Sequence, residues 1–425
     1  MSKFLLLLAG KFSAVKAYLK RVIADGGTTS DPAHAQVVYD NTIGDEPTLI
    51  QSCDSGKATV LYNIEPTNAD FTVDRNSTKY VLGSGGTIIS YATDEPAFEF
   101  NTDGSYKGLL VEPAATNLVT YSNDFSNWAN IFQSTVSQSV SSPDGTTNAW
   151  LFEDDGGGGA SGNVYVQSAG ITISASTSYT ASVFVKAGNN SEIQLKTAND
   201  DATRGGTFNV STETFTPLNS ETGTIIDVGN GWYRCSVTWT SGADTNIALR
   251  ISYPTITRDG TNSINIYGAQ LETGPIATSY IPTTTASVTR VKDDITQTSA
   301  SSLIGQTEGT LYVEVDWRLA TGTQQYLLSA SNGTGNNRIL LFQLSDLLYM
   351  YIDASGANIV TANVSATGFS GIQKIAFAYK TDDFELYRNG SSISSDTTGS
   401  LAALATMTDI DLGQAFSASL QANMW

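Results

Sequence analysis

The sequence predicts a mainly β protein in which a short N-terminal α-helix is followed by antiparallel β-sandwich or barrel domains. From about residue 30 onward, short runs of alternating apolar and polar residues replace the helical period of the N-terminal segment. Turn signals rich in Gly, Asn and Asp close these runs at near-regular spacing. Aromatic residues make up 10% of the chain and charged residues only 15%, a composition that suits pleated sheets and argues against disorder.

The helical pattern is confined to residues 1–27. Its apolar residues are spaced three and four apart, as in the seam of a heptad repeat: Leu5, Leu8, Phe12, Val15, Leu19 and Val22. Basic residues surround this seam, no acidic residue precedes Asp25, and Gly26-Gly27 supplies a helix stop. A signal peptide, a helix on a membrane surface and a short oligomerisation or docking helix all fit this pattern. We favour the docking helix, because three heptads alone gain their stability from partners.

The middle of the chain consists of short predicted strands joined by turns. Clean alternation marks strands at residues 179–186 and 232–240, each next to a turn signal of Asn or Gly residues. Trp232 and Trp239 lie seven residues apart on the second of these strands. Their side chains should therefore point to opposite faces of the sheet.

Three blocks of this region are similar to a known family. They are Lys107–Leu118 (KGLLVEPAATNL) with the following Tyr121–Phe125 (YSNDF), Asp227–Cys235 (DVGNGWYRC), and Gly268–Glu272 (GAQLE) with its continuation Ala277–Thr283 (ATSYIPT). In this order they resemble the carbohydrate-binding-module-like jelly roll of bacteriophage tail-fibre, tailspike and head-fibre proteins. The resemblance spans roughly residues 70–290 and implies a jelly roll over residues 119–292. It also implies that residues 28–118 are a β-rich region close to the virion.

A second series of predicted strands begins near residue 295. Alternating runs occupy residues 309–317, 339–344, 374–380 and 384–388, and Asn389-Gly390 after the last run indicates a tight hairpin. With Asp411-Leu412-Gly413-Gln414, this series resembles a concanavalin-A-like (laminin-G-like) lectin sandwich over residues 300–425. Such domains generally finish with a strand that pairs near their beginning, and the sequence stops before one. We therefore expect a longer native chain or a partner subunit to complete the sheet.

The charged and nucleophilic side chains exclude several classes of function. With 22 basic and 41 acidic residues, the net charge of −19 is incompatible with binding nucleic acid through its phosphates. The single histidine is His34, and Cys53 and Cys235 form no CxxC pair, so we expect neither a His-based catalytic triad nor a cysteine zinc site. No acidic pair stands out by its spacing as a glycosidase pair. We therefore expect no catalytic residue and no enzyme, with a polysaccharide depolymerase as the alternative.

The sequence does not assign a metal site. Gly156–Gly159 follow Glu153, Asp154 and Asp155, but they lack the Lys-Ser/Thr ending of a phosphate loop. We expect a flexible loop there, and a calcium site at the acidic residues is the alternative. No cofactor is expected, although a structural calcium ion is compatible with either sandwich.

Aromatic residues near turns are the candidate glycan-binding residues. Trp128, Trp150 and Tyr165 lie close to turns, where an exposed ring can stack on a sugar. Ordinary core packing or a subunit contact is the alternative for all three. Trp232 belongs to the second of the three motif blocks, and we expect it in the core.

Together these inferences predict a non-enzymatic appendage at the virion surface, a tail fibre, head fibre or spike, that binds host-surface polysaccharide. Residues 1–24 hold five basic and no acidic residues, so the rest of the chain has 17 basic against 41 acidic residues, or −24. We expect residues 1–25 to dock on other virion proteins, and the heptad seam permits a homotrimer. The alternatives are an architectural decoration or connector without glycan binding, a depolymerase, and a bacterial secreted lectin.

Overall fold

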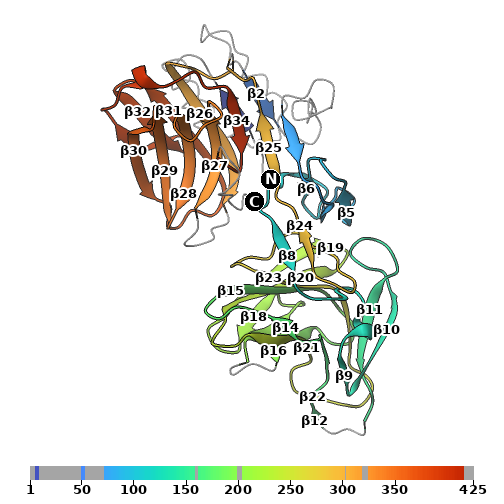
Figure 1. The fold of residues 1–425 in the computed structure, drawn as a ribbon. Helices are drawn as coiled ribbons and strands as arrows, with labels where there is room; N and C mark the ends of the chain where they lie inside the picture. The colour runs from blue at the N-terminus through green and yellow to red at the C-terminus, as the bar shows by residue number, and fades with distance from the viewer. Residues whose placement is uncertain are drawn as a thin grey trace.

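The computed structural model describes residues 5–8, 49–52, 71–157, 161–198, 203–301, 303–317 and 324–415. Strands dominate these ranges, and the helical elements in them are two single-turn 3₁₀ helices, η3 (Phe125–Asn127) and η4 (Leu401–Ala403). Figure 1 shows two β-sandwiches joined by a neck of short strands. The prediction of a mainly β protein with antiparallel sandwiches is confirmed. Among the described helices, none has the length and apolar character needed to cross a membrane.

The middle sandwich is built from two facing sheets, each of which we name after one of its strands. The β20 sheet has the order β10-β11-β23-β15-β20-β19, with bounds Ser134–Val140, Ala149–Asp154, Ser263–Thr273, Ser178–Ala187, Trp232–Thr240 and Thr222–Gly229. The β21 sheet has the order β18-β17-β16-β21-β13-β9, with bounds Thr214–Pro217, Gly205–Asn209, Glu192–Ala198, Asn246–Ser252, Tyr165–Gln167 and Asn130–Phe132. Strand β14 (Ile171–Thr172) also pairs with β21, and β12 (Ser161–Gly162) pairs with β22 (Ile256–Thr257).

The alternation of the sequence decides which residues of β20 enter the core of this sandwich. Cys235, Val237 and Trp239 pack between the two sheets. Trp232 belongs to a separate cluster on the other side of the β20 sheet, where it packs with residues such as Tyr267. The prediction that the two tryptophans face opposite sides is confirmed, and so is the prediction that Trp232 is buried.

The C-terminal sandwich also consists of two sheets around one core. The β26 sheet has the order β2-β1-β26-β31-β32-β33, with bounds Leu49–Ser52, Leu5–Leu8, Glu308–Trp317, Gly371–Lys380, Asp383–Arg388 and Ser391–Asp396. The β27 sheet has the order β3-β25-β34-β27-β28-β29-β30, with bounds Thr72–Asp74, Asp294–Gln297, Asp409–Leu412, Gln325–Ser331, Arg338–Leu344, Leu347–Ala354 and Ala357–Ser365.

The hairpin predicted at Asn389-Gly390 is confirmed. Strands β32 and β33 pair with Arg388 opposite Ser391, which leaves two residues in the turn. Asn389 has φ 46° and Gly390 has φ 87°, the two positive values that a type I′ turn requires. Asn and Gly tolerate this conformation at low cost, so the local sequence favours this two-residue turn, and the register of the pair shifts once beyond it, between Leu386 and Tyr387.

The β27 sheet contains a strand that precedes the middle sandwich in the sequence and another that follows it. Strand β34 is not its edge, because β25 pairs with β34 and β3 pairs with β25. The chain therefore contributes β3 before it builds the middle sandwich and β25 after it returns. The sheet continues past β34 through strands of this same chain, where the sequence led us to expect a longer chain or a partner subunit.

The predicted N-terminal helix is wrong over residues Leu5–Leu8, which form strand β1. This strand pairs with β2 on one side and with β26 on the other, where Leu7 lies opposite Tyr312. Pairing with β1 satisfies backbone groups that would otherwise be exposed along β26, a gain that the helical period of the sequence does not reveal. The other predicted seam residues, Phe12, Val15, Leu19 and Val22, lie outside the described residues, as do His34 and Cys53.

The neck between the sandwiches is formed by three two-stranded ladders (Figure 1). They pair β4 (Lys79–Leu82) with β5 (Ile88–Tyr91), β6 (Phe98–Phe100) with β7 (Tyr106–Leu109), and β8 (Ala115–Asn117) with β24 (Val288–Arg290).

A network of buried charges crosses the neck. Asp293 accepts from Arg75 at 2.8 Å and from Lys79 at 2.6 Å, and Glu112 lies 3.1 Å from Lys79 and 3.5 Å from Arg290. All five side chains are at most 1% exposed. Burial alone would raise the pKa of Glu112, but Arg290 and Lys79 lower it to about 2. The network therefore holds Glu112 ionised and joins three stretches of chain that are distant in the sequence.

Asn117, in the first motif block, fixes the crossing of the neck into the middle sandwich. Its side-chain amide donates to the backbone carbonyls of Ala269 and Ile281, at 3.1 and 2.8 Å. Its side-chain oxygen accepts from the backbone N–H groups of Val119 and Leu271, both at 3.1 Å. Because it is fully buried and satisfies four backbone groups, Asn117 ties the first motif block to the third.

Candidate functional site

Two of the three predicted glycan-binding residues are core residues of the middle sandwich. Trp128 is 5% exposed and Trp150 is 7% exposed. Their indole N–H groups donate to the backbone carbonyls of Tyr121 and Asn123, and Phe125 packs against both rings. Rings covered in this way cannot stack on a sugar. For these two residues the structure supports the packing alternative.

Tyr165 lies on the outward face of the β21 sheet, and its ring is covered on both sides. On β9, the ring of Phe132 stacks on it with a centroid distance of 5.1 Å and an interplanar angle of 19°. On β21, the guanidinium carbon of Arg250 lies 4.0 Å from the centre of the Tyr165 ring. Because β13 lies between β9 and β21, these two neighbours approach Tyr165 from opposite sides.

The exposed end of this stack is Phe132. Its side chain is 43% exposed, and β9 is the edge strand of the sheet, so none of the described strands pairs beyond it. A sugar can therefore stack on Phe132, while Tyr165 supports that ring from behind. Sequence reasoning selected Tyr165 and missed Phe132. The sequence contains no signal for this contact, because it depends on the pairing of β9 with β13.

Two cations lie next to the aromatic stack. Arg250 and Lys196 are direct cross-strand partners on β21 and β16. Arg250 donates twice to the side-chain oxygen of Gln167, at 2.9 and 2.6 Å, and Lys196 donates to that of Gln194 at 2.8 Å. Burial, followed by the charge of Arg250, lowers the pKa of Lys196. Within the described ranges, neither cation forms an ion pair with a carboxylate.

We call Phe132, Tyr165, Arg250, Lys196 and Gln167 together the Phe132 face. It offers an exposed ring and two cations on one face of the sheet, with the buried side chain of Gln167 accepting two hydrogen bonds from Arg250. This combination is complementary to a sugar. The C–H groups of a sugar pack on an aromatic ring, and its hydroxyls form hydrogen bonds with polar donors and acceptors.

The acidic residues before the glycine run organise a loop. Asp154 is buried, and its carboxylate accepts from the backbone N–H groups of Gly156, Gly260 and Asn262 and from the side chain of Asn262. Asp155 forms an ion pair of 2.6 Å with Arg258. Over the described part of the chain, no group of three or more His, Cys, Asp or Glu side chains is placed to hold a metal ion.

Comparisons with known proteins yield only distant structural similarity. No family model and no curated protein matches the chain. The carbohydrate-binding module CBM40 of the Ruminococcus gnavus IT-sialidase, bound to α2,3-sialyllactose, is 17% identical with a TM-score of 0.25, over 30% of this chain and 78% of that chain. Domains LG4-5 of the mouse laminin α1 chain are 11% identical with a TM-score of 0.20, over 60% of this chain and 79% of that chain. Neither similarity bears on the site, which depends on the geometry described above.

Proposed function

We propose that the protein is a non-enzymatic surface appendage of a bacteriophage virion that binds host-surface glycans through the Phe132 face. The observation that carries the binding part is the exposed ring of Phe132 stacked on Tyr165, with two cations on the opposite side of Tyr165 that lack carboxylate partners among the described residues. The chain has almost twice as many acidic as basic residues, so two adjacent cations without such partners are well suited to a ligand.

The virion part of the proposal depends on the sequence. It is supported by the resemblance of the three motif blocks to phage fibre proteins and by the basic character of residues 1–24. Assembly as a homotrimer would place three Phe132 faces on one particle appendage. Several weak sites acting together then give strong attachment by avidity.

Glycan binding is tested with the purified full chain on immobilised host polysaccharide. We expect Phe132→Ala and Arg250→Gln each to weaken binding roughly tenfold, because loss of a stacking ring or of a charged hydrogen bond costs about 1–3 kcal/mol. The matched control is Leu218→Ala, which changes a side chain of similar exposure, 39%, near the opposite edge of the same sheet. Binding that neither variant alters would overturn the Phe132 face as the site, and no binding by the wild type would leave the architectural alternative.

Attachment to the particle needs a test that leaves strand β1 in place. Deletion of residues 1–25 would also remove β1 from the β26 sheet, so a failure to assemble would be ambiguous. We therefore propose to replace the five basic residues of the segment with Gln and to measure incorporation into virions. Loss of incorporation with an unchanged unfolding temperature supports docking through this segment, and full incorporation refutes it. The oligomeric state is tested separately: a mass in solution for the purified wild-type protein other than that of three chains refutes the trimer.

A further inference from the structure

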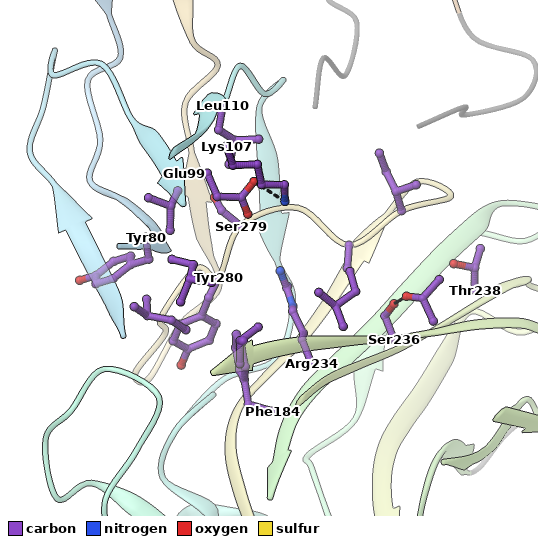
Figure 2. A pocket seen from close by; sticks show the side chains of 18 of the residues that line it. Tyr80, Glu99, Lys107, Leu110, Phe184, Arg234, Ser236, Thr238, Ser279 and Tyr280 are labelled. Carbon is purple, nitrogen blue, oxygen red and sulfur yellow. Dashed lines mark hydrogen bonds and ion pairs between the residues drawn. The ribbon is translucent and has the colours of Figure 1, made fainter. Parts of the chain in front are cut away.

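A cavity of about 380 Å³ lies on the outer side of the β20 sheet, where the neck covers it. Strands β19 and β20 supply one wall, the hairpins β4–β5 and β6–β7 supply another, and residues 275–280 complete it. Figure 2 shows the labelled side chains converging on this space from the sheet and from the neck. The cavity faces away from the β21 sheet and is separate from the Phe132 face.

The floor of the cavity is a row of hydroxyl groups on β19 and β20. Thr224 and Ser236 are cross-strand partners whose side-chain oxygens are 2.6 Å apart. Thr238, one step along the same face, hydrogen-bonds Thr180 of β15 at 2.8 Å. Such a floor offers donors and acceptors on a rigid strand, an arrangement suited to a ligand that itself carries hydroxyl groups.

Arg234 is the charged group of this floor, and its guanidinium has spare donors. One terminal nitrogen, Nη2, donates to the hydroxyl of Ser182 at 3.0 Å, and Nε is buried without a hydrogen-bond partner. No carboxylate within the described ranges lies within 4.0 Å of it, in contrast to Arg75 and Arg258, which both form ion pairs. In Figure 2, Arg234 points from β20 toward the side of the cavity that holds Glu99 and Lys107.

The remaining lining limits the charge and shape of a ligand. Glu99 and Lys107 form an ion pair of 2.7 Å, so with Arg234 the charged groups of the lining sum to +1. Apolar side chains such as Ile226 and the ring of Tyr280 supply the other walls. This lining suits one negative charge on a compact ring that has both apolar C–H groups and hydroxyls.

We propose that this cavity binds a hexuronic acid residue, with the carboxylate on Arg234 and the hydroxyls on the Thr224–Ser236 floor. A planar guanidinium binds a carboxylate through two parallel hydrogen bonds. Among the described residues, Arg234 uses its terminal nitrogens for one hydrogen bond, from Nη2 to Ser182, so Nη1 and the second N–H of Nη2 remain as donors for a carboxylate, whereas Nε is buried. The cavity volume is at the lower end of the range for small-molecule sites, which fits a single sugar ring.

A neighbouring cavity of about 360 Å³ indicates how a glycan chain would continue. The two cavities share lining residues that include Glu99 and Ile226, and the second reaches Asp316 of β26 in the C-terminal sandwich. Asp227 also lines this second space. The carboxylates of Asp227 and Asp316 disfavour an anionic sugar in the second cavity. The expected ligand therefore has a neutral sugar residue next to the uronic acid.

The test measures binding of methyl glucuronide, methyl glucoside and acetate to the full chain by ligand-observed NMR and calorimetry. We expect methyl glucuronide to bind at least tenfold more tightly than either of the others, and Arg234→Gln to abolish this preference. Ile226→Glu keeps Arg234 and adds an anion at a side chain that is 45% exposed, so it should weaken methyl glucuronide binding without a folding defect. Lys374→Gln, in the C-terminal sandwich, removes one positive charge elsewhere and is the control.

Three results would overturn the proposal. Equal binding of methyl glucoside would show that the carboxylate is not recognised, and equal binding of acetate would show that the sugar ring is not. No binding of methyl glucuronide, with the unfolding transition of the wild type intact, would exclude a hexuronic acid site. The inference does not rest on the Phe132 face, whose test uses other variants.

Discussion

Replacing Glu112 with Gln should destabilise the protein strongly. The variant keeps the size of the side chain and removes one of the two negative charges that neutralise Arg75, Lys79 and Arg290 in the neck. Lowering the pKa of Glu112 from 4.5 to about 2 corresponds to about 3 kcal/mol of stability, at about 1.4 kcal/mol per pKa unit. Breaking one partner of a buried ion pair typically costs roughly 3–5 kcal/mol, which agrees in size.

The assay is thermal unfolding of the full chain at pH 7. For domains of about 150–250 residues, each kcal/mol lowers the unfolding temperature by about 2–4 °C, so we expect a decrease of roughly 6–20 °C. Glu213→Gln is the control, because Glu213 is an exposed carboxylate outside the network. We expect its unfolding temperature to stay within about 2 °C of the wild type, in line with the small effect of surface charges.

The pH dependence gives a second, independent readout. Because folding lowers the pKa of Glu112, its stabilising contribution is present above pH 4.5 and is lost as the pH falls toward 2. The wild type should therefore lose about 3 kcal/mol over this interval that Glu112→Gln does not lose. A variant that unfolds within 2 °C of the wild type at pH 7, and shows the same acid profile, would refute the claim that this network holds the neck.

Three further predictions concern single side chains. Burial raises the pKa of Asp411 to about 6, so its neutral form favours folding below pH 3.8, and this contribution is lost as the pH rises through 6. At pH 8, Asp411→Asn should therefore be more stable to urea than the wild type, by up to about 3 kcal/mol. At pH 4 the variant and the wild type should have similar stability. Asn117→Leu leaves four buried backbone groups without partners, and a loss of at least about 3 kcal/mol is expected in urea unfolding. Gly390→Ala forces a φ of 87° on a side chain and should lower stability by about 1 kcal/mol, whereas an unchanged midpoint would contradict the type I′ assignment.

Local sequence patterns predicted the strands well and the contacts between distant segments poorly. The strand at residues 232–240 was predicted to the residue, because alternation and turn chemistry are local signals. Residues Leu5–Leu8 contradicted their helical period, since pairing with β26 is a long-range interaction. Arg75 and Asp293 are 218 positions apart, and nothing near either residue indicates that they form an ion pair.

The candidate sites show the same limit. Proximity to turns selected Trp128 and Trp150, but a residue close to a turn in sequence can still point into the core, and both do. Tyr165 does lie on the outward face of the β21 sheet, but its ring is covered by Phe132 on one side and Arg250 on the other, and its role in glycan binding stays a prediction. Arg234 lies within the second motif block, yet the cavity that it lines depends on the neck folding over the β20 sheet.

The positions of the motif residues separate the architecture of the molecule from the Phe132 face. Glu112, Asn117 and Trp232 belong to the three motif blocks or pack against them, and all three are buried at the neck or beside it. Phe132 and Arg250 lie outside the blocks, on the sheet that faces away from the neck. A sequence can therefore keep the neck and change the outward side chains of the β21 sheet, because these side chains contribute little to the core. In this arrangement the motif blocks identify the scaffold, and under the proposed function variation on the exposed sheet would change the ligand of the Phe132 face without altering the neck.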